Sequence, residues 1–141
     1  MTSKTKSPPS GVYLAPPDGQ ALREEAQKAG IAWFDLNLTR VESKREFLAA
    51  CAKGLRLPEW FGGNWDALAD CLKDLYAESM INCRNCGKFA EAAPDDYATA
   101  LEIFRDAATY WKERTSTFLV LVDAEPQGAT LSRFPAQKKE L

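Results

Sequence analysis

The chemically densest part of the chain is residues 57–72, which read LPEWFGGNWDALADCL. Asp66 and Asp70 in this stretch and Asp74 just after it recur every fourth residue, so a helix would place them along one face. Like charges stacked in this way cost roughly 0.2–0.5 kcal/mol per pair. The pattern alone leaves two interpretations open, which are a solvated acidic face and an interface that meets cations.

A short loop with two aromatic residues precedes this helix. Trp60 and Phe61 come before Gly62-Gly63, and Asn64 suits the N-cap of a helix that we expect over residues 64–77. Loop aromatics serve as core plugs or as interface anchors, and we expect one ring to point inward and one outward. The glycine pair is not a phosphate loop, because no Lys-Ser/Thr follows it.

Several classes of catalytic site are excluded by composition. The chain has no histidine, which removes Ser-His-Asp triads, Cys-His pairs and imidazole ligands. Cys83 and Cys86 form a lone CxxC motif without the further ligands of a zinc site, although a metal or redox role remains an alternative. Asp66 and Asp70 would be solvated on an outward helix face, and the sequence indicates no pocket in which such a carboxylate pair could act on a substrate. We therefore expect no catalytic residue, no metal and no cofactor.

Charge is unevenly distributed along the 141 residues. Residues 57–106 carry a net charge of −6 and the remainder +4, which gives −2 for the chain. An acidic surface disfavours nucleic-acid binding and favours a basic partner. Neither a run of about 18 apolar residues nor a secretory signal is present, so we expect a cytoplasmic protein without membrane contact.

Strand and helix patterns alternate along the chain. This alternation predicts an α/β fold, with a small parallel sheet of three to four strands packed with helices. We expect residues 1–10 to be a disordered tail, residues 11–125 one domain with an extra strand–helix unit at 11–30, and residues 126–141 a loose tail. The expected strands are 12–14, 31–38, 79–83 and 117–122. Four helices are expected. The first covers residues 21–29, the second starts at the capping box Ser43–Glu46, and the third covers residues 64–77. The fourth has Pro94 in its first turn and an apolar stripe from Tyr97 to Trp111.

The stretch LPEWFGGNWDALADCL resembles the inhibitory segment of the barstar family of ribonuclease inhibitors. Phe104-Arg105-Asp106 also matches the Phe-Arg-acid sequence of the last helix in that family. The likeness spans residues 31–123. It implies a binding protein that causes no chemical change, with a helix and loop that plug the active site of a basic, barnase-type ribonuclease.

The resemblance also implies roles for single residues. Asp70 would occupy a phosphate subsite, Asp66 and Asp106 would pair with further cations, and Trp60 would pack on the enzyme. The partner-binding residues that it suggests are Trp60, Phe61, Gly62, Asn64, Asp66, Ala69, Asp70, Asp74 and Asp106. The implied partner is a basic secreted ribonuclease or a bacterial ribonuclease toxin, against which the chain would act as antitoxin or immunity protein, monomeric when free.

Two departures from the family pattern affect this hypothesis. Ala69 stands where many relatives carry a tryptophan, and residues 77–89 form a short, cysteine-containing segment where the family has a loop and a hydrophobic strand. A regulatory or protein-interaction module that retains the fold without inhibiting a ribonuclease is therefore the alternative function.

Overall fold

The computed structural model describes residues 10–58, 61–75 and 78–134 of the chain. Within them, four strands form one parallel sheet in the order β1-β4-β3-β2. The elements are β1 (Gly11–Leu14), α1 (Gly19–Lys28), β2 (Ala32–Asn37), α2 (Lys44–Gly54), α3 (Trp65–Leu72), β3 (Ser79–Arg84), α4 (Gly87–Ala92), α5 (Pro94–Lys112) and β4 (Phe118–Val122).

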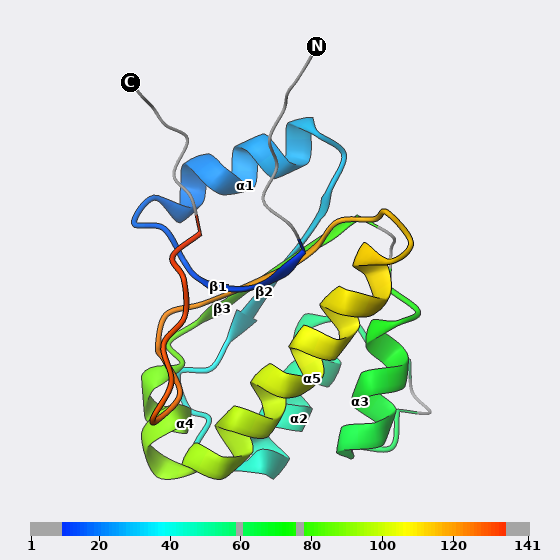
Figure 1. Cartoon of the computed structure of the whole chain (residues 1–141). Helices are drawn as coiled ribbons and strands as arrows, with labels where there is room; N and C mark the ends of the chain where they lie inside the picture. Colours follow the sequence, from blue (N-terminus) through cyan, green and yellow to red (C-terminus); the bar gives the residue numbers. More distant parts are fainter. Residues whose placement is uncertain (1–9, 59–60, 76–77, 135–141) are drawn as a thin grey trace.

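The sheet separates two unequal layers of helices. α1 lies over one face, and α2, α3, α4 and α5 lie on the other, as Figure 1 shows. The expected α/β fold with a parallel sheet is confirmed. No helix of the described residues is long and apolar enough to cross a membrane.

The central strand β4 shows why the sequence folds in this way. All five of its residues are buried, as expected for a parallel strand covered on both faces. Phe118, Val120 and Val122 point into the large core beneath α2–α5, whereas Leu119 and Leu121 pack in a smaller cluster towards α1. The period of two along a strand therefore divides one apolar run between two cores.

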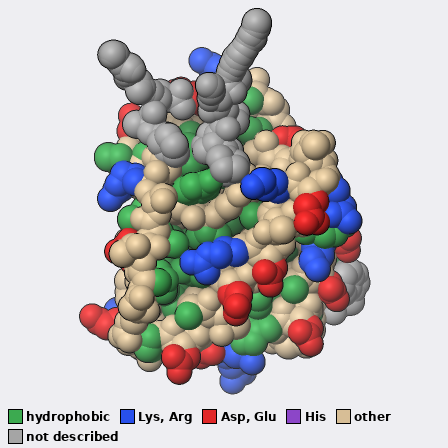
Figure 2. Space-filling view, viewed as in Figure 1, with side chains coloured by type: hydrophobic (Ala, Val, Ile, Leu, Met, Phe, Trp, Pro, Cys, Tyr) green, Lys and Arg blue, Asp and Glu red, His purple; other side chains and the backbone are tan. Residues whose placement is uncertain are grey.

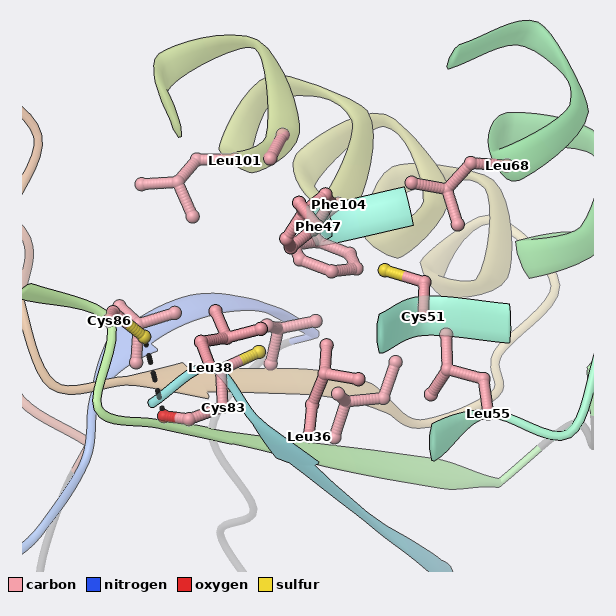
Figure 3. Packing of buried hydrophobic residues seen from close by; sticks show 14 of the residues in the cluster. Leu36, Leu38, Phe47, Cys51, Leu55, Leu68, Cys83, Cys86, Leu101 and Phe104 are labelled. Atoms are coloured by element: carbon pink, nitrogen blue, oxygen red, sulfur yellow. Dashed lines mark hydrogen bonds between the residues drawn. The ribbon is translucent and has the colours of Figure 1, made fainter. Parts of the chain in front are cut away.

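Aromatic rings hold the large core together. The Phe47 ring stacks on Phe89 with centroids 5.1 Å apart, meets Phe104 edge-on at 6.3 Å and lies 5.9 Å from the Trp65 ring. These four residues come from α2, α4, α5 and α3. Figure 3 shows Phe47 and Phe104 side by side above the leucines of the sheet. Phe47 thus joins all four helices of this layer.

The capping box at the start of α2 forms with one difference from the prediction. The Glu46 N–H donates to Ser43 Oγ at 3.2 Å, as expected. The Glu46 carboxylate accepts from the Glu42 N–H at 2.8 Å instead of from the serine N–H. The side chain therefore reaches one residue further back, and it still satisfies a backbone donor just before the helix.

Two predictions about the remaining elements need correction. Residues 87–92 form α4, which the sequence patterns did not indicate. The segment from residue 126 to Phe134 was expected to be loose, but its end is bound to β1. The Leu14 N–H donates to the Ser132 carbonyl at 2.8 Å, and the Leu14 carbonyl accepts from the Phe134 N–H at 2.7 Å. Phe134 is 5 % exposed and packs edge-on against Tyr13 in the α1-side core. Residues 1–9 and 135–141, where further tail was expected, lie outside the described residues.

Gly54 ends α2 where that helix touches β2. A Cβ atom there would lie 2.7 Å from Leu36 Cδ1 and 3.1 Å from the Asp35 carbonyl oxygen. We expect Gly54→Ala to lower the free energy of unfolding by about 1–2 kcal/mol, because the overlap outweighs the better helix propensity of alanine. Gly87→Ala is the control, since its Cβ would meet nothing within 4 Å. Urea unfolding of both variants tests this prediction, and equal stability of the two would contradict it.

Candidate partner-binding surface

The start of α3 is fixed by the three residues before it. Asn64 is the N-cap, and its Oδ1 accepts from the Ala67 N–H at 2.7 Å. Gly63 has φ of +69°, a left-handed conformation that favours glycine. A Cβ at Gly62 would lie 3.3 Å from Asn64 Nδ2, close to the capping side chain. The sequence Gly62-Gly63-Asn64 therefore sets the direction in which α3 leaves the loop.

The end of α3 differs from the prediction. The helix ends at Leu72 and not near residue 77, because the last N–H groups, of Lys73 and Asp74, bond three residues back to Asp70 and Cys71. The Trp111 indole N–H donates to the Leu72 carbonyl at 3.0 Å. A continuing helix would use that carbonyl for its own N–H four residues on. A contact from α5 thus satisfies the end of α3.

Removing this capping contact provides a test of its importance. We expect Trp111→Phe to lower the free energy of unfolding by about 1–2 kcal/mol, because the buried Leu72 carbonyl loses its donor while the ring remains. Trp33→Phe is a matched control, since Trp33 Nε1 is buried without a hydrogen-bond partner among the described residues. Thermal unfolding of the two variants distinguishes them, and a larger loss in Trp33→Phe would contradict the assignment.

The two sides of α3 have opposite character. Leu68 and Leu72 are fully buried, and Trp65 is half-buried against Phe47. Asp66 and Asp70 are exposed on the helix, and Asp74 is exposed in the turn beyond it. The predicted acidic face is therefore present, although Asp74 follows the end of the helix and does not lie on a third helical turn. Residues 76 and 77, where the predicted helix would end, lie outside the described residues.

Asp106 belongs to the neighbouring helix. α5 lies beside α3 (Figure 1), and Lys73 Nζ at the end of α3 lies 5.5 Å from the ring centroid of Tyr110 on α5. Asp106 is exposed, one turn before Tyr110. Figure 2 shows acidic side chains spread over the lower and right-hand parts of this view, where α5 and α3 lie, with basic side chains among them.

None of the four aspartates is neutralised by a described neighbour. The ion pairs among the described residues join Arg23 and Arg84 to Asp35, and Lys88 to Glu42. Asp66, Asp70, Asp74 and Asp106 have no lysine or arginine nitrogen of these residues within 4 Å. The pKa of the Cys71 thiol is raised by burial and further by the charges of Asp74 and Asp70. The negative charge on α3 is thus available to an external cation.

The loop before α3 contains Phe61, and Ala69 lies on α3 itself. Phe61 is half-buried, packs against the large core and donates its N–H to the Pro58 carbonyl at 2.9 Å. It is thus mainly an inward ring. Trp60, expected to be an outward anchor, lies outside the described residues. Ala69 is half-buried, one residue before Asp70.

The CxxC motif lies where β3 meets α4. Cys83 and Cys86 are buried, and the Cys86 thiol donates to the Cys83 carbonyl at 3.5 Å (Figure 3). Burial raises the pKa of both thiols, that of Cys86 to about 12. The described residues contain no group of three or more side chains placed to hold a metal ion.

These pKa shifts predict slow thiol chemistry. We expect a disulfide reagent at pH 8 to label Cys83 and Cys86 much more slowly in the folded protein than in urea, because the thiolate is the reactive form and both sulfurs are buried. Time-resolved labelling with peptide mapping tests this prediction. Rapid labelling of either residue in the native state would instead favour a redox role.

Comparison with known protein families identifies the family of this chain. The family model described as "Barstar (barnase inhibitor)" matches residues 31–123. The chain belongs to the barstar family. No curated protein gives a significant match.

The barstar-family match covers the chain from just before β2 to just after β4. It includes the whole α3 surface, and the barstar family is one of inhibitors. β1, α1 and the segment around Phe134 lie outside it, and they build the edge of the sheet and the α1-side core.

Proposed function

We propose that this barstar-family chain inhibits a basic, barnase-type ribonuclease by covering its active site with the acidic surface of α3 and α5. The supporting observation is the set of exposed aspartates, Asp66, Asp70, Asp74 and Asp106, on or beside two adjacent helices, none of which forms an ion pair with a lysine or arginine of the described residues. An uncompensated acidic surface favours association with a partner of opposite charge.

The chemistry of inhibition would be mimicry of RNA. A ribonuclease active site holds arginine and lysine side chains that bind phosphate, and a carboxylate offers them a similar planar pair of oxygen acceptors. Asp70 is the central residue of the proposal, with Asp66 and Asp106 as flanking acids. Binding blocks substrate access and needs no bond to form or break, so the chain acts as an inhibitor and not as an enzyme.

The loop before α3 would provide the apolar contact. Phe61 anchors the loop on the core, while Gly62 and Asn64 set its path into the helix. Trp60 is proposed as the residue that packs on the enzyme. Ala69 would leave space beside Asp70 that the partner must fill, which makes this position a determinant of the ribonuclease that fits.

The proposal is tested by titrating the protein into activity assays of several barnase-type ribonucleases. We expect stoichiometric loss of RNA cleavage with at least one of them. A ribonuclease with an acidic surface serves as the control for non-specific effects, since it would repel the exposed aspartates. No inhibition of any enzyme at micromolar protein would contradict the proposal and favour a non-inhibitory interaction module, an alternative that the small residue Ala69 supports. We propose that the protein acts in the cytoplasm and is a monomer when free.

A further inference from the structure

A groove lies beside the acidic surface, between α2 and the loop before α3. It has a volume of about 430 Å³ and is lined by Lys44, Arg45, Leu48, Ala49, Ala52, Phe61 and Gly63. The floor is apolar, because it consists of short aliphatic side chains of α2 and the ring of Phe61. Its only charged lining groups among the described residues are the two cations at the start of α2.

The cations of the groove are available for binding. Lys44 and Arg45 are exposed, and neither has a carboxylate of the described residues within 4 Å. Lys44 Nζ lies 5.5 Å from the centroid of the Trp65 ring, which places it at the first residue of α3. The partial positive charge of the α3 N-terminus adds to this potential.

The groove and the acidic surface are close enough to contact one partner. Gly63 lines the groove, and the exposed Asp66 in the first turn of α3 is only three residues further along the chain, so their Cα atoms lie within about 11 Å. The charge of the surface therefore changes sign within a distance much shorter than the width of a standard protein interface, which buries roughly 800 Å² on each partner. A partner that covers the acidic surface as far as Asp66 would therefore reach the groove.

We propose that the groove receives an acidic segment with an apolar side chain from the same ribonuclease, beside that enzyme's basic active site. This inference rests on the proposed function. Charge complementarity supports it, because two cations above an apolar floor suit a carboxylate next to a buried hydrophobic group. An interface with both signs of charge also fixes the orientation of the partner and rejects basic proteins that lack the acidic segment.

Charge reversal in the groove tests this inference. We expect Lys44→Glu/Arg45→Glu to weaken inhibition at least tenfold. Arg40→Glu/Lys53→Glu is the matched control: it changes the net charge equally at exposed positions outside the groove. Lys44→Glu/Arg45→Glu should fold, since acids at the first positions of α2 favour the helix N-terminus. Arg40→Glu/Lys53→Glu should also fold, because both side chains are exposed and the unfavourable acid in the last turn of α2 costs only about 0.3–1 kcal/mol. Thermal unfolding checks this, and the inhibition constants are compared at 0.05 M and 0.5 M salt.

The outcomes separate the groove from the acidic surface. The groove proposal is supported if only Lys44→Glu/Arg45→Glu inhibits more weakly and if this difference is still present at 0.5 M salt. Direct contacts are screened by salt less than long-range attraction. If the two double variants have equal inhibition constants while Asp70→Ala inhibits more weakly, the groove proposal is rejected and the proposed function stands. If Asp70→Ala inhibits as well as the unmodified protein, the binding mode proposed for the acidic surface falls, and the groove proposal falls with it. No inhibition of any ribonuclease by the unmodified protein would instead overturn the proposed function.

Discussion

Asp70→Ala is expected to weaken inhibition of a matching ribonuclease by more than about 2 kcal/mol, or roughly thirtyfold in the inhibition constant. The reason is that the cations of the enzyme would be covered by the complex and left without their carboxylate partner. This magnitude is the one typical of close charge pairs at protein interfaces, of which barnase with barstar is a measured example.

The same substitution should not harm the free protein. Asp70 is exposed and stands four residues after Asp66, so its removal relieves a repulsion of roughly 0.2–0.5 kcal/mol within the helix. Binding and stability should therefore change in opposite directions. Isothermal titration and urea unfolding of one preparation measure both. Glu25→Ala on α1 is the control, because this acid is exposed on the other side of the sheet. Equal affinity of Asp70→Ala and Glu25→Ala would contradict the proposed binding mode.

The elements predicted correctly are those whose signal is local. The apolar run of β4 marks a strand buried on both faces, and the spacing of Tyr97, Leu101 and Phe104 marks α5. Most of the acidic stripe was also predictable, because helical periodicity alone places Asp66 and Asp70 opposite Leu68 and Leu72.

The errors concern features that depend on distant residues. At the end of α3, the Leu72 carbonyl accepts from an indole of α5 that is 39 positions away in sequence, a contact that no local pattern indicates. The segment near Phe134 is ordered because one ring fills space beside Tyr13, which leaves no periodic pattern. α4 was missed because it has six residues, one of them fully buried, and no side-chain cap. The groove of Lys44 and Arg45 was also missed, since it exists only where Phe61 approaches α2.

Phe47→Ala is expected to cause the largest loss of stability, about 3–5 kcal/mol. The side chain is 1 % exposed, and its ring contacts rings from α3, α4 and α5. Its removal would leave a cavity that these helices cannot close without moving away from the sheet. Because most domains of this size are stable by only about 5–15 kcal/mol, the variant should lie close to its unfolding threshold.

The position of α3 makes this core substitution informative about function. Trp65, the first residue of α3, packs on Phe47, so the acidic surface depends on that ring for its orientation. Phe47→Leu keeps most of the volume and should lose less than half as much stability as Phe47→Ala. At a temperature where Phe47→Leu is fully folded, it should still inhibit more weakly than the unmodified protein, because α3 loses one of its aromatic supports. Unchanged inhibition by folded Phe47→Leu would mean that the loop and its cap at Asn64 orient α3 without this ring.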